Sequence, residues 1–187
     1  MKNKFDRLCE LKNMVSSDDE YLCSQAAKAP LLGLPEMLAL ARGDNPHALA
    51  ALAARPGLPS KAIRAIVSSD PGADVVSLAL RGYKGRKALR EVARSGRRFV
   101  RRIAAAHPET EEGVLCDLAL DNYEDVRMAI VAREEIPLSV QRILARDPSA
   151  EVRRALARYL DQRDFRLEIY ETLKRDIDPA VAEIVTK

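Results

Sequence analysis

The chain repeats itself at a fixed step of 26 residues. Stepping by this interval gives an apolar column six members deep: Ala26, Leu52, Leu78, Ala104, Ile130 and Leu156. A second column holds small side chains (Ala27, Ala53, Ala79, Ala105, Val131, Ala157), and a third holds larger ones (Leu40, Ile66, Val92, Leu118, Leu144). A step without insertions from about residue 22 to residue 160 predicts an array of stacked structural units.

Each unit contains two short stretches with helical periodicity. In the fifth unit, Val126 and Ile130 lie on one stripe of a first helix, and Val140 and Leu144 lie on one stripe of a second. All prolines fall at or near the expected junctions, where they suit turns and first helical positions: residues 30, 35, 46, 56, 59, 71, 108, 137, 148 and 179. The sequence therefore predicts an all-α chain, an α-solenoid of about six helix-pair repeats.

Polar residues mark where several helices are expected to begin. Asn122, Thr110 and the pair Asp178-Pro179 each precede a helical pattern, and residues 17–20 (Ser-Asp-Asp-Glu) resemble a capping box. The column of alanines predicts that neighbouring helices approach to about 8 Å, the close end of helix packing.

The whole chain, residues 1–187, is expected to be one repeat domain with distinct ends. Residues 3–15 have the pattern of an amphipathic helix. Near the C-terminus the step slips, because Leu144 maps onto Leu173, 29 residues further on. The predicted organisation is an N-terminal capping helix within 1–16, repeats over 20–160, and a modified C-terminal repeat over 161–187.

The segments 107–110 (His-Pro-Glu-Thr), 114–119 (Val-Leu-Cys-Asp-Leu-Ala) and 125–127 (Asp-Val-Arg) resemble the bacterial leucine-rich repeat variant, which belongs with the HEAT-like α-solenoids. A second HEAT-like feature is an Asp six residues before an Arg, at Asp121/Arg127 and Asp147/Arg153. The resemblance implies that these pairs link neighbouring units in a ladder. It leaves open whether each first helix is α or 3₁₀. In the third unit, residues 82–85 (Gly-Tyr-Lys-Gly) replace the proline turn.

Charge is distributed unevenly along the chain. Residues 81–102 contain ten basic side chains against Glu91, a local charge of +9, while the whole chain carries +3. The remainder therefore sums to −6, and residues 109–125 are an acidic run without a basic side chain. The helical spacing of Arg86, Arg90 and Arg94 predicts one exposed stripe. The candidate partner-binding residues are Arg86, Lys87, Arg90, Arg94, Arg97, Arg98 and Arg102.

Three interpretations of these basic residues stay open. They are a solvated face or the contact for an acidic protein partner, a nucleic-acid contact flanked by Tyr83 and Phe99, or a surface that pairs with the chain's own residues 109–125. Arg101 stands apart, since it shares a column with Arg127 and Arg153 and is expected to join the ladder.

No constellation of side chains indicates catalysis. The chain has no Gly-x-Ser-x-Gly, no phosphate-binding glycine loop and no His-Glu-x-x-His. It also has no Cys-x-x-Cys, although some leucine-rich repeat variants carry an iron–sulfur cluster. His47 and His107 are expected to serve their turns rather than a metal. We therefore expect a non-enzymatic interaction module, without a cofactor, metal or small-molecule substrate, that binds a protein; nucleic acid is the alternative.

Cysteine usage and hydropathy bear on location. Cys9, Cys23 and Cys116 are odd in number and widely spaced, which favours a reducing compartment, the cytoplasm. No stretch approaches the roughly 20 apolar residues that span a bilayer. Charged side chains stand where an export signal at the N-terminus would need an apolar core.

Overall fold

The computed structural model describes residues 4–69, 71–81, 83, 85–161 and 167–186. Within these residues the regular elements are all α-helices, and none is a strand, which confirms the all-α prediction. The first helix of each described pair is α rather than 3₁₀. The chain divides into two compact units, residues 1–92 and 93–187, and each unit is described by itself.

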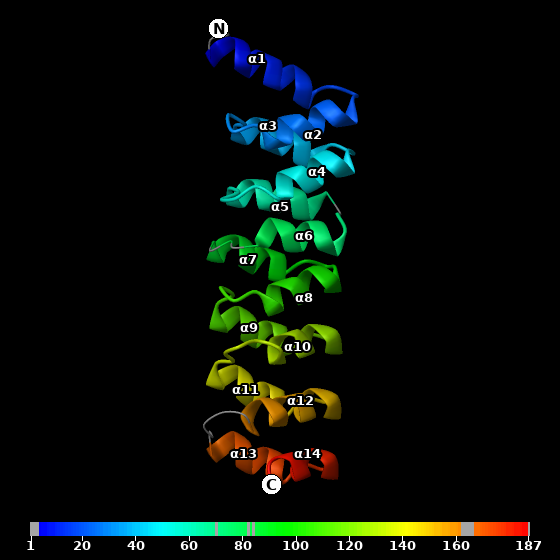
Figure 1. Ribbon diagram of the computed structural model, residues 1–187. Helices are drawn as coiled ribbons and strands as arrows, with labels where there is room; N and C mark the ends of the chain where they lie inside the picture. The colour runs from blue at the N-terminus through cyan, green and yellow to red at the C-terminus, as the bar shows by residue number, and fades with distance from the viewer. Residues whose placement is uncertain (1–3, 70, 82, 84, 162–166, 187) are drawn as a thin grey trace. The chain divides into compact units, whose positions relative to one another are not determined.

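In the first unit, helices lie in two rows (Figure 1). Helix α2 packs against α4 and α4 against α6, while α3 packs against α5; α1 contacts both α2 and α3. Helices α1 to α4 thus each contact the element two places further along the chain, as a repeat of helix pairs requires. The helices are α1 (Lys4–Val15), α2 (Glu20–Lys28), α3 (Leu34–Arg42), α4 (Pro46–Ala53), α5 (Ser60–Ser68), α6 (Ala73–Leu80) and α7 (Arg86–Ala93), which belongs to this unit up to Val92.

The second unit has the same pattern of contacts between alternate helices. Helix α8 packs against α10, α10 against α12, and α12 against α14, while α9 packs against α11 (Figure 1). None of the described helices in either unit combines the length and the apolar character needed to cross a membrane. The helices are α8 (Arg98–Ala106), α9 (Glu112–Leu118), α10 (Glu124–Val131), α11 (Leu138–Leu144), α12 (Ala150–Asp161), α13 (Leu167–Lys174) and α14 (Pro179–Ile184).

The columns found by stepping 26 residues coincide with the core of both units. Members of the larger column are at most 4 % exposed: Leu40, Ile66, Val92, Leu118 and Leu144. The whole small column, from Ala27 to Ala157, is also buried. Leu78 is the one member of the first column that is only half-buried. Burial therefore repeats with the step of the sequence, as the solenoid hypothesis requires of these positions.

The predicted start signals are partly right. Asp178 accepts a hydrogen bond from the N–H of Ala180 and opens α14 as expected. The capping box at residues 17–20 is wrong, because Asp19 caps α2 by accepting from the N–H groups of Tyr21 and Leu22 at 2.8 and 3.3 Å. Its carboxylate stands closer to the first turn than the hydroxyl of Ser17, which instead accepts from the N–H of Asp19.

Two other starts are displaced by one residue. Helix α10 begins at Glu124 after Tyr123 rather than directly after Asn122, and α9 begins at Glu112 after Glu111. Thr110 is buried and its hydroxyl points back, donating to the carbonyl of Ala104 at 2.6 Å. This threonine therefore closes the end of α8 instead of opening α9.

The second unit contains the predicted ladder of arginines and aspartates. Arg127 donates from Nε and Nη2 to the two carboxylate oxygens of Asp147 at 2.7 and 2.9 Å, and from Nη1 to the carbonyl of Asp121 at 2.7 Å. Arg101 binds the carboxylate of Asp121 in the same way. Arg153 binds that of Asp176 and the carbonyl of Asp147.

This geometry refines the predicted pairing. The residue six positions before each arginine supplies a backbone carbonyl (Ser95 for Arg101, Asp121 for Arg127 and Asp147 for Arg153), while the carboxylate comes from an aspartate of the following repeat. Asp121 and Asp147 therefore each join two arginines. Two-point binding between a guanidinium and a carboxylate is among the stronger and more directional contacts in proteins.

A second column of side chains reaches back one repeat to bind helix C-termini. Arg55 donates from Nη1 to the carbonyls of Ala27 and Ala29 at 2.8 and 2.9 Å. At the same repeat position in the second unit, Arg133 donates to the carbonyl of Ala105 at 3.0 Å and also to that of His107. These carbonyls lie at the ends of α2 and α8, where a helix leaves its last acceptors without internal partners.

Candidate binding surfaces

The seven candidate partner-binding residues are divided between the two units. Helix α7 carries Arg86, Lys87 and Arg90 in the first unit, all exposed, with Ala88, Leu89 and Val92 buried on its other side. The second unit carries Arg94, Arg98 and Arg102, which are exposed, and Arg97, which is half-buried. Because they belong to separate units, the predicted continuous surface stays a prediction.

Three further cations of the first unit, Arg42, Lys61 and Arg64, lie on α3 and α5. Lys61 stands one 26-residue step before Lys87, and Arg64 stands one step before Arg90. Arg42 ends α3, the neighbour of α5. None of the three belongs to the candidate set predicted from the sequence, because they lie outside the stretch of high net charge at residues 81–102. Following the repeat columns backward from α7 finds Lys61 and Arg64.

Helices α3, α5 and α7 are linked within the first unit. Helix α3 packs against α5. The hydroxyls of Ser60 and Tyr83 are 2.6 Å apart, and Arg64 Nη1 lies 2.9 Å from Glu91 Oε1, so α5 also contacts α7. We call the cations of this row the basic face: Arg42, Lys61, Arg64, Arg86, Lys87 and Arg90.

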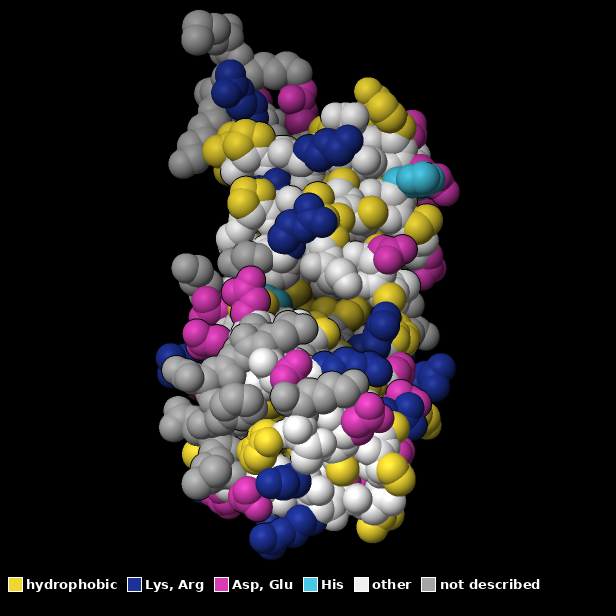
Figure 2. Space-filling model, turned by 60° about the horizontal axis from the view of Figure 1, so that its bottom comes forward, with side chains coloured by type: hydrophobic (Ala, Val, Ile, Leu, Met, Phe, Trp, Pro, Cys, Tyr) yellow, Lys and Arg dark blue, Asp and Glu magenta, His cyan; other side chains and the backbone are white. Residues whose placement is uncertain are grey.

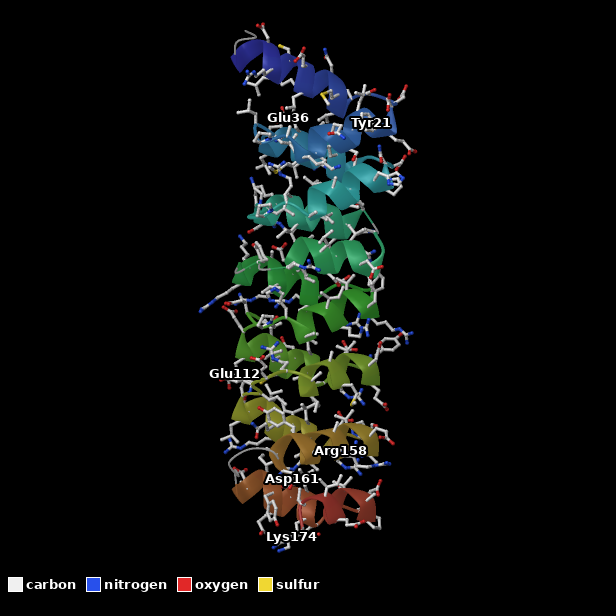
Figure 3. All side chains as sticks on the ribbon, viewed as in Figure 1. Tyr21, Glu36, Glu112, Arg158, Asp161 and Lys174 are labelled. Atoms are coloured by element: carbon white, nitrogen blue, oxygen red, sulfur yellow. The ribbon has the colours of Figure 1, made fainter. Side chains whose placement is uncertain are left out.

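The two rows of helices in the first unit differ in charge. The row of α3, α5 and α7 holds the six cations of the basic face and two acids, Glu36 and Glu91, while α2, α4 and α6 together hold Lys28 against Glu20 and Asp74. Glu36 lies on the first turn of α3 (Figure 3), at the opposite end from Arg42, and its carboxylate folds over Gly33. The charge is therefore concentrated on one row.

A groove of about 530 Å³ lies on this row. Its lining combines cations, hydroxyls and apolar groups from α3 and α5: Leu38, Arg42, Lys61, Arg64, Ala65, Ser68 and Ser69. Leu38 and Ala65 are half-buried, whereas Arg42 and Lys61 are exposed. Such a groove can hold an anionic group beside an apolar one.

The Arg64–Glu91 ion pair at this groove is open to solvent. Its side chains are 39 % and 37 % exposed, so the pair is weak and exchangeable. Three repeats later Arg142 occupies the position of Arg64 and binds Glu168 at 2.8 Å, with both side chains again exposed. The second unit thus supplies a matched counterpart of the pair.

In the second unit, arginines lie close to two aromatic rings, exposed Tyr123 and half-buried Phe99. The guanidinium carbons of Arg98 and Arg101 lie 5.4 and 5.6 Å from the centre of the Tyr123 ring, which is 46 % exposed. Arg97 lies 5.3 Å from the ring of Phe99. These are cation–π distances, and Arg beside an aromatic ring also suits stacking on nucleobases.

The ladder arginines serve the fold. Hydrogen bonds to Asp147 and Asp176 raise the pKa of Arg127 and of Arg153, respectively, above the ordinary value for arginine. The hydrogen bond from Arg153 lowers the pKa of Asp176. Burial acts to raise the pKa of Asp121, but hydrogen bonds from Arg101 and from the N–H of Tyr123 outweigh it, and the pKa is lowered. These groups stay charged and paired near neutral pH.

The acidic run of residues 109–125 has mixed roles. Asp121 belongs to the ladder, and Glu112, at the edge of the second unit in Figure 3, accepts a hydrogen bond from the hydroxyl of Ser139. On the face drawn in Figure 2, basic, acidic and apolar side chains are interspersed. The net charge of a stretch of sequence therefore does not define a charged surface. The position of each charged side chain on its helix is also needed.

The two histidines and three cysteines of the chain are residue types that commonly bind metals. The Nδ1 atom of His107 accepts from the N–H of Glu109, which confirms its predicted role in the turn, and His47 is exposed. All three cysteines are free. Within the part of the chain that the structure describes, no three His, Cys, Asp or Glu side chains gather as a metal site would require.

Comparison with known proteins adds no relative: no family model matches the chain, nor does any curated protein or solved structure.

Proposed function

We propose that this chain is a non-enzymatic α-solenoid of the HEAT-like kind, a cytoplasmic interaction module that binds an acidic protein partner through the basic face of its first unit. The repeat architecture is supported by burial that recurs every 26 residues and by packing between alternate helices in each unit. The proposal assigns no catalytic residue, cofactor or metal. The free thiol of exposed Cys9 suits a reducing compartment.

One observation carries the binding proposal: six cations lie on the row of α3, α5 and α7, against two acids, one of which, Glu36, lies next to Gly33 at the N-terminal end of α3. Like charges on neighbouring helices repel one another, so a partner with negative charge relieves this repulsion as it binds. Complementary charge also speeds the encounter of two proteins and aligns them.

The test measures retention of the full chain on immobilised poly-glutamate, heparin, DNA and RNA across a salt series. We expect binding to poly-glutamate that the double charge reversal Arg86→Glu/Arg90→Glu abolishes, with thermal stability nearly unchanged, since surface substitutions usually alter stability by under about 0.5 kcal/mol. The matched control is Arg146→Glu/Arg158→Glu, which makes the same change in net charge at exposed positions of the second unit (Arg158 is labelled in Figure 3). Equal loss in both double variants contradicts the proposal, because it indicates a response to net charge alone.

Nucleic acid is the second candidate partner, through residues 81–102. The stacking of Arg98 and Arg101 around exposed Tyr123 favours it. Under this alternative, duplex DNA or RNA outcompetes poly-glutamate. The logarithm of affinity then falls with the logarithm of salt by about 0.9 per phosphate contacted on duplex DNA.

A further inference from the structure

The charged side chains that line the groove between α3 and α5 are, among the described residues, all basic: Arg42, Lys61 and Arg64. The carboxylate of Glu91 stands beside this lining, where it pairs with Arg64. Helix α5 carries no acidic side chain, and the one acid of α3, Glu36, lies at the other end of that helix over Gly33. The lining therefore favours an anionic occupant.

The same groove offers apolar contact beside the cations. Leu38 and Ala65 are half-buried members of the lining, to which Ser68 and Ser69 also belong. Among the described residues, none with an aromatic ring lines the groove, although proteins commonly use such a ring to stack a base of single-stranded nucleic acid. A volume of about 530 Å³ lies in the range of pockets that hold a few connected groups. An acidic peptide with one apolar side chain fits this lining better than a nucleic acid does.

Glu91 shows how a carboxylate binds at this place. Its Oε1 atom lies 2.9 Å from Nη1 of Arg64, and both side chains are more than one third exposed. A carboxylate from a ligand can take the same position only when Glu91 leaves it. The chain's own Glu91 is therefore a competitor for the anion site.

We propose that the α3–α5 groove binds an acidic peptide segment carrying an apolar anchor residue, and that Glu91 competes with the peptide for Arg64. The acidic side chains of the peptide contact Arg42, Lys61 and Arg64, and its anchor packs on Leu38 and Ala65. This inference rests on the proposed function and narrows it, since it names the site and the chemistry of the segment that the site receives.

The test is a fluorescence anisotropy titration of the full chain with a labelled synthetic peptide in which glutamates flank one central leucine. We expect Arg64→Gln and Lys61→Gln each to weaken binding about tenfold or more, the scale of a hydrogen bond between charged groups. Glu91→Gln is expected to tighten binding several-fold, because it releases Arg64. Arg142→Gln, at the same repeat position in the second unit, is the matched control and leaves the affinity unchanged.

Two further measurements complete the experiment, one with an altered peptide and one with a competitor. Replacing the peptide's leucine by serine is expected to weaken binding, and an oligothymidylate of equal charge is expected to compete poorly. Unaltered affinity in Arg64→Gln and Lys61→Gln, equal loss in Arg142→Gln, or weaker binding in Glu91→Gln overturns the proposal, as does strong competition by the oligothymidylate. If the groove variants have no effect while poly-glutamate retention persists, the groove is wrong and the proposed function stands. If neither probe binds, both fail.

Discussion

Arginines occupy one repeat position in the second unit where the first unit has smaller or aliphatic side chains: Arg101, Arg127 and Arg153 against Cys23, Leu49 and Val75. The arginines bind the carboxylate of the next repeat and a carbonyl six residues earlier. Cys23 keeps only the second contact, since its thiol donates to the carbonyl of Ser17, also six residues earlier, at 3.1 Å. Leu49 is buried, and its aliphatic side chain can make neither of these polar contacts.

This difference separates two uses of positive charge. The buried charged side chains among the described residues, Arg127, Asp147 and Arg153, all belong to the second unit. In the first unit, the core of the repeat is apolar and the cations of α3, α5 and α7 lie at its surface. A count of basic residues treats both kinds alike, although only the surface kind is open to solvent.

The largest expected effect comes from cutting the ladder. Arg127→Ala leaves the carboxylate of Asp147, whose side chain is 1 % exposed, without its partner, and removing one partner of a buried pair typically costs about 3–5 kcal/mol. We expect this loss in urea unfolding, with hydrogen exchange placing the lost protection in α10 and α12. The double variant Arg127→Met/Asp147→Leu should recover most of the stability. If Arg127→Ala lowers the free energy of unfolding by less than about 1 kcal/mol, the ladder contributes little to stability.

The second largest effect is expected at low pH, which should destabilise the second unit before it destabilises the first. Asp121 and Asp176 have lowered pKa values in the folded chain, so each contributes stability above the ordinary carboxyl pKa of 3.8, and this contribution is lost as the pH falls through the lowered value. We expect hydrogen exchange between pH 6 and pH 3 to show earlier loss of protection in the second unit. Asp176→Asn should remove part of that pH dependence. If both units lose protection at the same pH, the ladder aspartates are not the source of the acid sensitivity.

Helix spacing, in contrast, is expected to be a property that the units share. Ala105 and Ala53 stand in the same buried column, one in each unit, and both are fully covered. Replacing either by leucine overpacks the helix contact and should cost about 1–3 kcal/mol. Thermal melts of Ala53→Leu and Ala105→Leu measure this directly. An unchanged melting temperature in both variants would remove the close-packing argument.

Sequence alone predicted the parts of this molecule that depend on periodicity. A buried side chain must recur wherever a repeat recurs, so the columns through Leu40 and Ala27 anticipated the core, and the column of Arg127 anticipated the ladder. Local polar contacts were less predictable. Residues 17–20 offer several oxygens within one turn, and only the backbone geometry decides that Asp19 caps α2.

The groove could not be predicted from the sequence, for a different reason. Lys61 and Arg64 are a short step apart in a stretch with little net charge, so a window that sums charge passes over them. Their relation to Lys87 and Arg90 appears only when the repeat step is applied to exposed positions as well as to buried ones. How far Leu38 and Ala65 are covered depends on side-chain packing between α3 and α5, which no periodicity specifies.

The smallest expected effect distinguishes an exposed ion pair from a ladder pair inside the same unit. Arg142 and Glu168 are 48 % and 57 % exposed, whereas Arg153 and Asp176 are 9 % and 5 % exposed. Exposed pairs contribute about 0–1 kcal/mol because water and salt screen them and because ordering two long side chains is unfavourable. Arg142→Gln, and equally Arg64→Gln in the first unit, should therefore change the free energy of unfolding by less than about 0.5 kcal/mol, while Arg153→Gln changes it by several times more.

Urea unfolding of the three variants side by side makes this comparison. A small effect for Arg64→Gln and Arg142→Gln means that a change in peptide affinity at Arg64 reports on binding, because the fold around it is intact. A loss for Arg142→Gln that equals the loss for Arg153→Gln would mean that exposure does not separate structural from available arginines. The basic face would then have to be defined again, by contacts instead of by position along the helix.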